Sequence, residues 1–280
     1  MEMLLSLFPG EYVEQIRKIG TKDLEEIRIR AGQPVLIRKR NVEHWLYPKS
    51  TSEEVLNILK RACRQSVYAY TETIRRGFVT IEGGHRIGVC GTGVLDNGTT
   101  QSIVSPSSLL FRIARPWPGF ANGLLAAAPA SMLLIGPPCS GKTSLLRDLV
   151  RLISDVWLQR VSLVDERGEL AAVVDGVPQN DVGIRTDVMS NIPKSEGIMI
   201  MLRTMNPQWI AVDEITSPSD ICALEQASYC GVRLLATAHA DRMEDLHLRP
   251  LYREMMDKKI FSTIVILKQD KTYEVMEGIA

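Results

Sequence analysis

The residues from 136 to 143 have the types and the spacing needed to bind a phosphate. They read GPPCSGKT, which satisfies the pattern G-x-x-x-x-G-K-[ST]. Glycines let the backbone wrap a phosphate with its N–H groups, Lys142 can reach the outer phosphates of a nucleotide, and the Thr143 hydroxyl can take a place on Mg²⁺. We therefore predict a site for ATP and Mg²⁺. Its nucleotide-binding residues are predicted to be Gly136, Pro137, Pro138, Cys139, Ser140, Gly141, Lys142, Thr143 and Ser144.

Hydrolysis would need acidic groups as well, and a pair of them follows the apolar run WIAV at 209–212. At the end of a strand, Asp213 can hold Mg²⁺, partly through its water shell, and Glu214 can polarise the attacking water. We therefore assign Asp213 to the metal and Glu214 to the catalytic base.

A second acidic pair, Asp165 and Glu166, ends the run VSLV at 161–164. On the sequence alone, either pair could hold the metal. The pair at 213 and 214 is preferred because one strand between the phosphate loop and the metal-binding acid is typical of the glutamate-using branch of phosphate-loop ATPases.

A third polar strand end is predicted at Thr237-Ala238-His239, after the run RLLAT. A polar residue in this place can reach the γ-phosphate and report its loss, whereas a lone histidine is most often a satisfied surface group. The residues alone leave both interpretations of His239 open.

The elements that must position these residues are predicted by short apolar runs bounded by turn signals. Such runs are typical of strands buried on both faces of a parallel sheet, and helical stretches lie between several of them. The helix after the phosphate loop carries Leu145, Leu146 and Leu149 on its sheet-facing side. We predict an α/β domain with helices on both faces of the sheet. Its strands are predicted at 132–135, 161–164, 209–212, 233–237 and 262–267.

The first part of the chain has a different pattern, which predicts a smaller α+β domain over residues 1–115. Strands are predicted at 24–30 and 34–39, and a further pair, 78–81 and 86–90, lies around Gly83-Gly84. A helix from Glu53 to about Arg64 should begin at Thr51, which forms a capping box with Glu54. The segment 116–122 contains Pro116 and Pro118 and is predicted to be a linker to the domain 123–280.

The composition of 45% hydrophobic and 24% charged residues is that of an ordinary globular protein. No apolar run predicts a membrane span, and the N-terminus does not read as a signal peptide, so we expect a cytoplasmic protein. The five cysteines form no C-x-x-C pair, which argues against a disulfide framework or a zinc site.

The charges are unevenly distributed along the chain. Residues 1–120 contain 17 Lys and Arg against 12 Asp and Glu, and residues 121–280 contain 16 against 21. This asymmetry is either chance or a sign that a basic face of one subunit meets an acidic face of the next.

Four segments, in order, resemble the secretion ATPase superfamily of type II and type IV secretion and pili: the phosphate loop, VDERGEL, MLRTMNPQWIAVDEI and GVRLLATAHA. They are similar to its Walker A, Asp box, Walker B and His box. The resemblance implies a RecA-like fold and makes His239 a phosphate sensor. It also places Asp165, Glu166 and Glu169 near Mg²⁺ and the attacking water.

In that superfamily, arginines of the N-terminal domain and linker reach the nucleotide, often across a subunit boundary. The candidates are Arg86, Arg112, Arg115, Arg185 and Arg203, of which Arg112 and Arg115 rank first because they precede the linker. The implied catalytic set is Lys142, Glu166, Glu214, His239, Arg112 and Arg115, and the implied Mg²⁺ set is Thr143, Asp213 and Asp165.

Longer segments resemble one branch, the stage III sporulation protein AA family of endospore-forming bacteria. They are NDVGIRTDVMSNIPKSEGIMIMLRTMNPQWIAVDEI, LEEIRIRAGQPV and GGHRIGVCG. The resemblance implies a hexameric ATPase of the mother cell, peripheral to the membrane at the forespore septum. It would power or assemble the channel between the two cells and contact channel proteins of a secretion-like complex. Thr216 departs from the pattern, because relatives commonly have Gly after DEI, and residues 1–10 leave little N-terminal extension.

Three other functions compete with this one. A small-molecule kinase would share the phosphate loop but needs an acceptor pocket and an arginine lid. A nucleic-acid-handling RecA-like ATPase would suit the basic N-terminal half, but the excess is small and no aromatic-rich basic patch is present, so nucleic acid is not the expected partner. An ATP-binding scaffold without turnover would not require Asp213 and Glu214.

Overall fold

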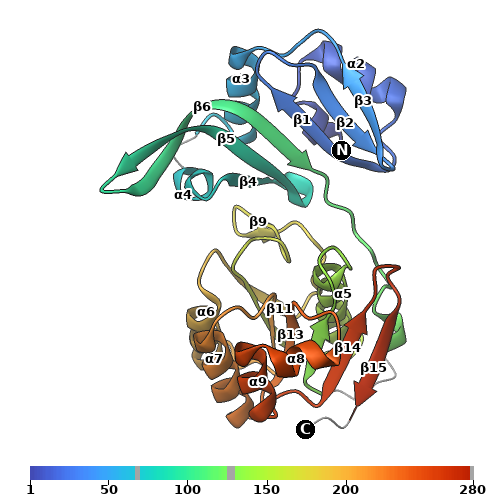
Figure 1. The fold of residues 1–280 in the computed structure, drawn as a ribbon, viewed down its shortest axis with the longest axis vertical. Coiled ribbons are helices and arrows are strands. Elements are labelled where there is room, and N and C mark those ends of the chain that lie inside the picture. Colours follow the sequence, from blue (N-terminus) through green and yellow to red (C-terminus); the bar gives the residue numbers. More distant parts are fainter. Residues whose placement is uncertain (67–69, 125–129, 278–280) are drawn as a thin grey trace. The chain divides into compact units, whose positions relative to one another are not determined.

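The computed structural model describes residues 1–66, 70–124 and 130–277. The chain divides into two compact units, Met1–Arg115 and Pro116–Ala280, and Figure 1 draws the first in blue and green and the second in green to red. Each unit has its own hydrophobic core. Within the described ranges, no helix is long and apolar enough to cross a membrane.

The first unit is built on a six-stranded antiparallel sheet in the order β3-β2-β1-β6-β5-β4 (Figure 1). Side chains from its helices and strands form a single buried cluster. Its helices are α1 (Glu2–Leu5), α2 (Gly10–Ile19), α3 (Ser52–Ala62), α4 (Thr71–Arg75) and a 3-10 turn, η2 (Glu82–Gly84). Its strands are β1 (Leu24–Arg30), β2 (Val35–Lys39), β3 (Val42–Leu46), β4 (Phe78–Ile81), β5 (His85–Asp96) and β6 (Thr99–Arg112).

The predicted start of α3 is confirmed. Thr51 Oγ1 accepts a hydrogen bond from Glu54 N at 3.1 Å, and Thr51 N donates to the Glu54 carboxylate at 2.7 Å. These reciprocal bonds satisfy two backbone donors that a helix start leaves without intrahelical partners.

The predicted strand at 86–90 is too short, because β5 continues to Asp96 and pairs with β6 in a long hairpin. The hairpin turns at Asn97-Gly98, where both residues have positive φ (48° and 77°), as a tight two-residue turn requires. The extension contains small and polar residues rather than an apolar alternation, which is why the sequence pattern missed it.

The second unit is built on a seven-stranded sheet in the order β11-β8-β12-β13-β7-β14-β15. Neighbouring strands from β11 to β14 are parallel, and only the edge strand β15 is antiparallel to its neighbour. Its strands are β7 (Met132–Ile135), β8 (Val161–Asp165), β11 (Thr186–Ser190), β12 (Trp209–Val212), β13 (Arg233–Ala238), β14 (Thr263–Leu267) and β15 (Tyr273–Glu277), and a separate small hairpin is formed by β9 (Val173–Val174) and β10 (Val177–Pro178).

Helices cover both faces of this sheet, as predicted. Along β7, Leu133 and Ile135 contribute to a cluster on one face, and Met132 and Leu134 contribute to a cluster on the other. The helix α5 (Lys142–Asp155) packs into the second cluster. The cluster on the other face, which contains Leu133 and Ile135, receives residues from α6 (Lys194–Thr204), α7 (Pro218–Tyr229), α8 (Met243–Leu248) and α9 (Pro250–Asp257). A 3-10 turn, η3 (Asn122–Leu124), precedes β7.

The five predicted parallel strands are confirmed, and β13 lies between β7 and β12. The carboxyl ends of parallel strands lie at one edge of the sheet, so the phosphate loop, Asp213 and His239 all follow strands at that edge. The segment 116–122 does not act as a free linker throughout, because Ala121 is buried in the second unit and its N–H donates to Asp148 at 2.8 Å.

Candidate active site

The phosphate loop joins β7 to α5 in a conformation that depends on its glycines. Gly141 has φ 103°, which an L side chain rarely adopts, and a Cβ added at Gly136 would lie 2.7 Å from Leu267 O and 2.9 Å from Ser140 Oγ. Within the described structure, no side chain caps the start of α5. Its first backbone N–H groups and its positive dipole end are thus directed at the loop, where they favour an anion.

Two buried polar side chains in the loop fit a phosphate ligand. The Lys142 side-chain amine donates to Gly136 O at 2.7 Å and to Pro137 O at 2.9 Å, and the residue is only 7% exposed. Burial lowers the pKa of Lys142, against the opposing effect of the Asp213 and Glu214 carboxylates. Ser140 Oγ is buried without a hydrogen-bond partner among the described residues. A buried hydroxyl without a partner is costly, and a phosphate oxygen would satisfy it.

Asp213 connects the phosphate loop with the neighbouring strand. Thr143 Oγ1 donates to Asp213 Oδ2 at 2.8 Å, although the residues are 70 positions apart, and Thr237 Oγ1 donates to Asp213 Oδ1 at 2.5 Å. One hydroxyl and one carboxylate are typical protein ligands of a Mg²⁺ ion that is otherwise held by phosphates and water. Across the described ranges no group of three or more His, Cys, Asp or Glu could hold a metal. By their chemistry and their mutual contact, Thr143 and Asp213 fit a Mg²⁺ ion bound together with a nucleotide.

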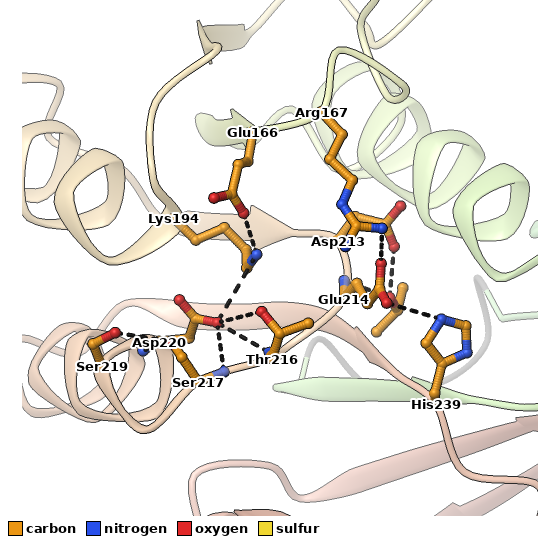
Figure 2. A network of polar contacts seen from close by, with 11 residues as sticks. Glu166, Arg167, Lys194, Asp213, Glu214, Thr216, Ser217, Ser219, Asp220 and His239 are labelled. Carbon is orange, nitrogen blue, oxygen red and sulfur yellow. Dashed lines mark hydrogen bonds and ion pairs between the residues drawn. The ribbon is translucent and has the colours of Figure 1, made fainter. Parts of the chain in front are cut away.

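Glu214 is fixed at both its backbone and its carboxylate. It has φ 54°, a left-handed conformation that is uncommon outside glycine, and its N–H donates to Thr237 Oγ1 at 2.7 Å. Its Oε2 accepts from Arg167, and its Oε1 lies 3.1 Å from His239 Nε2. Figure 2 shows Arg167 and His239 reaching this carboxylate from different sides.

His239 follows β13, and its imidazole lies beside the carboxylate of Glu214. Its role as a phosphate sensor stays a prediction. Its Nδ1 is buried and lacks a partner in the part of the chain that the structure describes. Its backbone is held by Tyr252 Oη, which accepts from His239 N at 3.2 Å, and by Arg249, which donates to His239 O at 2.6 Å. The backbone of His239 is therefore fixed, and its imidazole faces Glu214 through Nε2.

Asp165 is placed differently from the expectation that it binds Mg²⁺. It is 2% exposed, and its two carboxylate oxygens accept hydrogen bonds from the backbone N–H groups of residues 169 to 172. Because both oxygens are used by the backbone, Asp165 organises the loop after β8 in this structure. It is Asp213, and not Asp165, that meets Thr143.

Glu166 also differs from its expected catalytic role, because its carboxylate forms an ion pair with the buried Lys194. Lys194 Nζ lies 3.9 Å from Asp220 Oδ2 as well. Asp220 in turn accepts from the N–H of Ser217 at 3.1 Å, in the capping box that begins α7. In Figure 2, Glu166 points toward Lys194, whereas the next residue, Arg167, points toward Glu214.

Of the arginines predicted to reach the nucleotide, Arg86, Arg115 and Arg185 make other contacts within their own units. Arg115 Nη1 lies 3.9 Å from Asp23 Oδ1, and Arg86 lies over the ring of Phe78. Arg112 is opposite Arg86 in the register of β5 and β6. Arg185 donates to Ser154 O at 3.5 Å. The roles of Arg112 and Arg115 toward a nucleotide stay predictions.

Sequence reasoning missed Arg167 and named Thr237 only as part of a polar strand end, without giving it a role in the site. Both lie inside the segments that were singled out, Thr237 in GVRLLATAHA and Arg167 in VDERGEL. Thr237 is the next-to-last residue of β13, the strand that lies beside β12. The sequence carried no signal for Arg167, because the direction of a loop side chain depends on how the loop is folded.

Comparison with known proteins agrees with this architecture. The profile of the family described as "Sporulation stage III, protein AA" matches residues 11–280. "Stage III sporulation protein AA" of Bacillus subtilis (strain 168) is 37% identical over 257 residues, covering 89% of this chain and 84% of that protein.

Two solved structures share the fold at 15% identity. The ATPase DotB of Legionella pneumophila has a TM-score of 0.61 and covers 96% of this chain and 81% of its own. The pilus retraction motor PilT with bound ADP has a TM-score of 0.62 and covers 95% of this chain and 82% of its own. The fold is thus the RecA-like fold of secretion ATPases, preceded by a smaller α+β unit. Together, the profile match and the 37% identity show that this chain belongs to the Sporulation stage III, protein AA family.

Proposed function

We propose that this protein hydrolyses ATP in a Mg²⁺-dependent reaction. The observation that carries the proposal is the contact of Asp213 with both Thr143 and Thr237, with Glu214 as the next residue. It joins a phosphate-binding loop, a place for a metal ion and a carboxylate in one site. A scaffold that only binds ATP would have no need of the fixed carboxylate of Glu214.

Each side chain has a defined part in this reaction. The N–H groups at the start of α5 and the hydroxyl of Ser140 bind phosphate oxygens, and Lys142 turns from its own loop to the outer phosphates. Thr143 and Asp213 would hold Mg²⁺, and the bound ion would supply positive charge at the phosphates. Glu214 accepts a proton from the attacking water. His239, which lies beside Glu214, contacts the γ-phosphate.

We further propose that the enzyme acts as a homo-oligomeric ring, with six subunits, on the mother-cell side of the forespore septum. In that ring Arg112 or Arg115 would reach the nucleotide of a neighbouring subunit and stabilise charge on the transferred phosphoryl group. Support comes from the family, the secretion-ATPase fold and the opposite charges of the two halves. The work of the ring would be to power or assemble a channel between mother cell and forespore, through contacts with membrane channel proteins.

The test is Mg-ATP hydrolysis by the purified full chain beside Lys142→Ala, with particle mass measured in the same samples. We expect wild-type turnover, loss of ATP binding in Lys142→Ala, and a mass that shifts toward a hexamer with ATP and Mg²⁺. Wild type that binds ATP without turnover, including in the presence of membranes that carry the channel proteins, would support a scaffold instead. A monomer under all nucleotide conditions would contradict the ring.

A further inference from the structure

We infer that Arg167 is a positioning residue that holds the carboxylate of Glu214 in the orientation needed to activate water. The inference rests on the proposed ATP hydrolysis and adds a residue to it. Arg167 forms an ion pair with Glu214 Oε2, and the two residues come from different strand ends, 47 positions apart in the chain.

The loop that carries Arg167 is held in place by several buried and half-buried hydrogen bonds. Asp165 accepts from the backbone N–H groups of residues 169 to 172. Arg147 donates to Glu169 O at 2.6 Å and to Leu170 O at 2.8 Å, and Asn180 donates to Leu170 O at 2.7 Å. Because these contacts fix the backbone on the C-terminal side of Arg167, the loop can present this side chain in one direction.

The residue before Arg167, Glu166, fixes the loop on its N-terminal side. Glu166 pairs with Lys194, which is buried and also lies near Asp220 of α7. Two consecutive side chains of the loop therefore bind different partners, Glu166 on the side of α6 and α7 and Arg167 on the side of Glu214 (Figure 2). Burying Lys194 is costly unless carboxylates neutralise it, so this contact resists displacement of the loop.

An arginine suits this task better than His239, the other partner of Glu214. A guanidinium is always protonated, so it holds the carboxylate at every working pH, whereas His239 is a cation only when it is protonated. Each carboxylate oxygen can accept more than one hydrogen bond. Among the described residues each oxygen of Glu214 has one such partner, so the carboxylate can still accept a hydrogen bond from the attacking water and take its proton.

The contact is better placed for catalysis than for stability. The side chain of Arg167 is 56% exposed and that of Glu214 is 22% exposed. Ion pairs with an exposed partner contribute little to the free energy of folding. Orientation of a general base, in contrast, governs a rate contribution of about 10² to 10⁴. Removing Arg167 should therefore change turnover far more than folding.

The experiment measures kcat, KM and ATP affinity for the full-length wild type, Arg167→Ala, Arg167→Lys, Glu214→Gln and the double variant Arg167→Ala/Glu214→Gln. We expect Arg167→Ala to lower kcat by about tenfold or more with ATP affinity unchanged. Arg167→Lys should recover part of the rate because it restores the charge without the planar fork. In the Glu214→Gln background, Arg167→Ala should cause no further loss, because the group that it positions is gone.

Arg160→Ala is the matched control. Arg160 also lies in the second unit and donates to Asn206 O at 2.9 Å, but it precedes β8 at the opposite end of the strand. Its replacement should leave kcat unchanged. Thermal unfolding midpoints of all variants exclude a loss by misfolding.

The outcomes separate this inference from the proposed function. Wild-type turnover that Arg167→Ala does not change overturns the inference and leaves the proposed function standing. A further loss of rate in the double variant also overturns it, because Arg167 would then act on something other than Glu214. A wild type without turnover under any condition overturns both.

Discussion

At the scale of single residues, Thr237 links the metal-binding and base-positioning parts of the site. Its hydroxyl donates to Asp213 Oδ1 and accepts from Glu214 N, and the residue is almost completely buried. One hydroxyl thus orients Asp213 toward Thr143 and stabilises the left-handed backbone of Glu214. This double contact gives Thr237 a role that its position in the sequence suggests but does not specify.

Thr237→Val removes both hydrogen bonds and keeps the shape of the side chain. We expect turnover to fall by about tenfold and the Mg²⁺ requirement to rise, because Asp213 loses a donor and its orientation. Folding should be destabilised by about 1–3 kcal/mol, because buried polar groups lose their partner. Steady-state kinetics over a Mg²⁺ titration measure the first effect and chemical unfolding the second. Thr237→Ser is the control, and an unaltered Mg²⁺ requirement in Thr237→Val would contradict this role.

A second prediction at this scale concerns Asp165, which the structure places in the loop rather than on the metal. Asp165→Asn leaves one carbonyl oxygen in place of two carboxylate oxygens, so the N–H groups of residues 169 to 172 lose part of their acceptor. We expect a loss of about 1–3 kcal/mol in folding stability and unchanged Mg²⁺ dependence of ATP binding. A large rise in the Mg²⁺ requirement of Asp165→Asn would instead show that Asp165 is a Mg²⁺ ligand.

The sequence alone singled out the segments that form the site but not how each residue in them is used. The phosphate loop and the acidic strand ends predicted Thr143 and a nearby carboxylate, with Asp213 preferred over Asp165 by analogy with phosphate-loop ATPases. Asp165 and Asp213 could not be told apart by pattern, because both follow apolar runs. They differ only in three dimensions, where one strand lies between β12 and β7 and two strands lie between β8 and β7.

At the scale of elements, local sequence patterns predicted helix starts and buried strands, whereas the edge strands depend on tertiary context. The capping box at Thr51 and the start of α7 at Ser217 follow from local hydrogen bonds. The edge strands β11 and β15 were missed because they are only partly buried or exposed, so their residues need not form continuous apolar runs.

His85, at the start of β5, makes the first unit sensitive to acid. It is buried, and its Nδ1 accepts from Ala114 N at 3.1 Å, which requires a ring nitrogen without a proton. Burial lowers its pKa. The folded state thus favours neutral His85, so its stabilising contribution is complete above the unfolded pKa of about 6.5 and is lost as the pH falls through the folded pKa.

The matching experiment is chemical unfolding of wild type and His85→Gln, followed by circular dichroism at about pH 7.5 and about pH 5.5. Gln keeps an acceptor that does not titrate, so we expect the variant to lose less stability than wild type between these values. Equal losses in the two proteins would show that His85 is not the responsible group.

At the scale of the whole molecule, the two halves of the chain carry opposite excess charge. Residues 1–120 hold 17 basic against 12 acidic residues, and residues 121–280 hold 16 against 21. Head-to-tail contacts that close produce rings, and opposite charges on the contacting faces would favour them. In the proposed oligomer, the opposite charges of the two halves would attract neighbouring subunits, a function that they would not have in a monomer.

This explanation predicts a salt-sensitive assembly. Raising the salt from about 0.05 M to about 0.5 M shortens the Debye length to a few ångströms and screens exposed charges. We expect the ATP-dependent oligomer to dissociate over this range while the folded fraction stays constant. Sedimentation velocity measures the first quantity and circular dichroism the second. An oligomer that is equally stable in high salt would show that apolar contacts, not charge, hold it together.

The most direct test of the account is ATP binding and Mg-ATP turnover by Glu214→Gln compared with wild type. Glu43→Gln is the matched control, because it makes the same change at an exposed position on β3. If Glu214 activates the attacking water, the variant binds ATP as wild type does and its turnover falls by about 100-fold or more, while Glu43→Gln is unaffected. Wild-type turnover in Glu214→Gln would contradict the catalytic role of this residue and the site built around it.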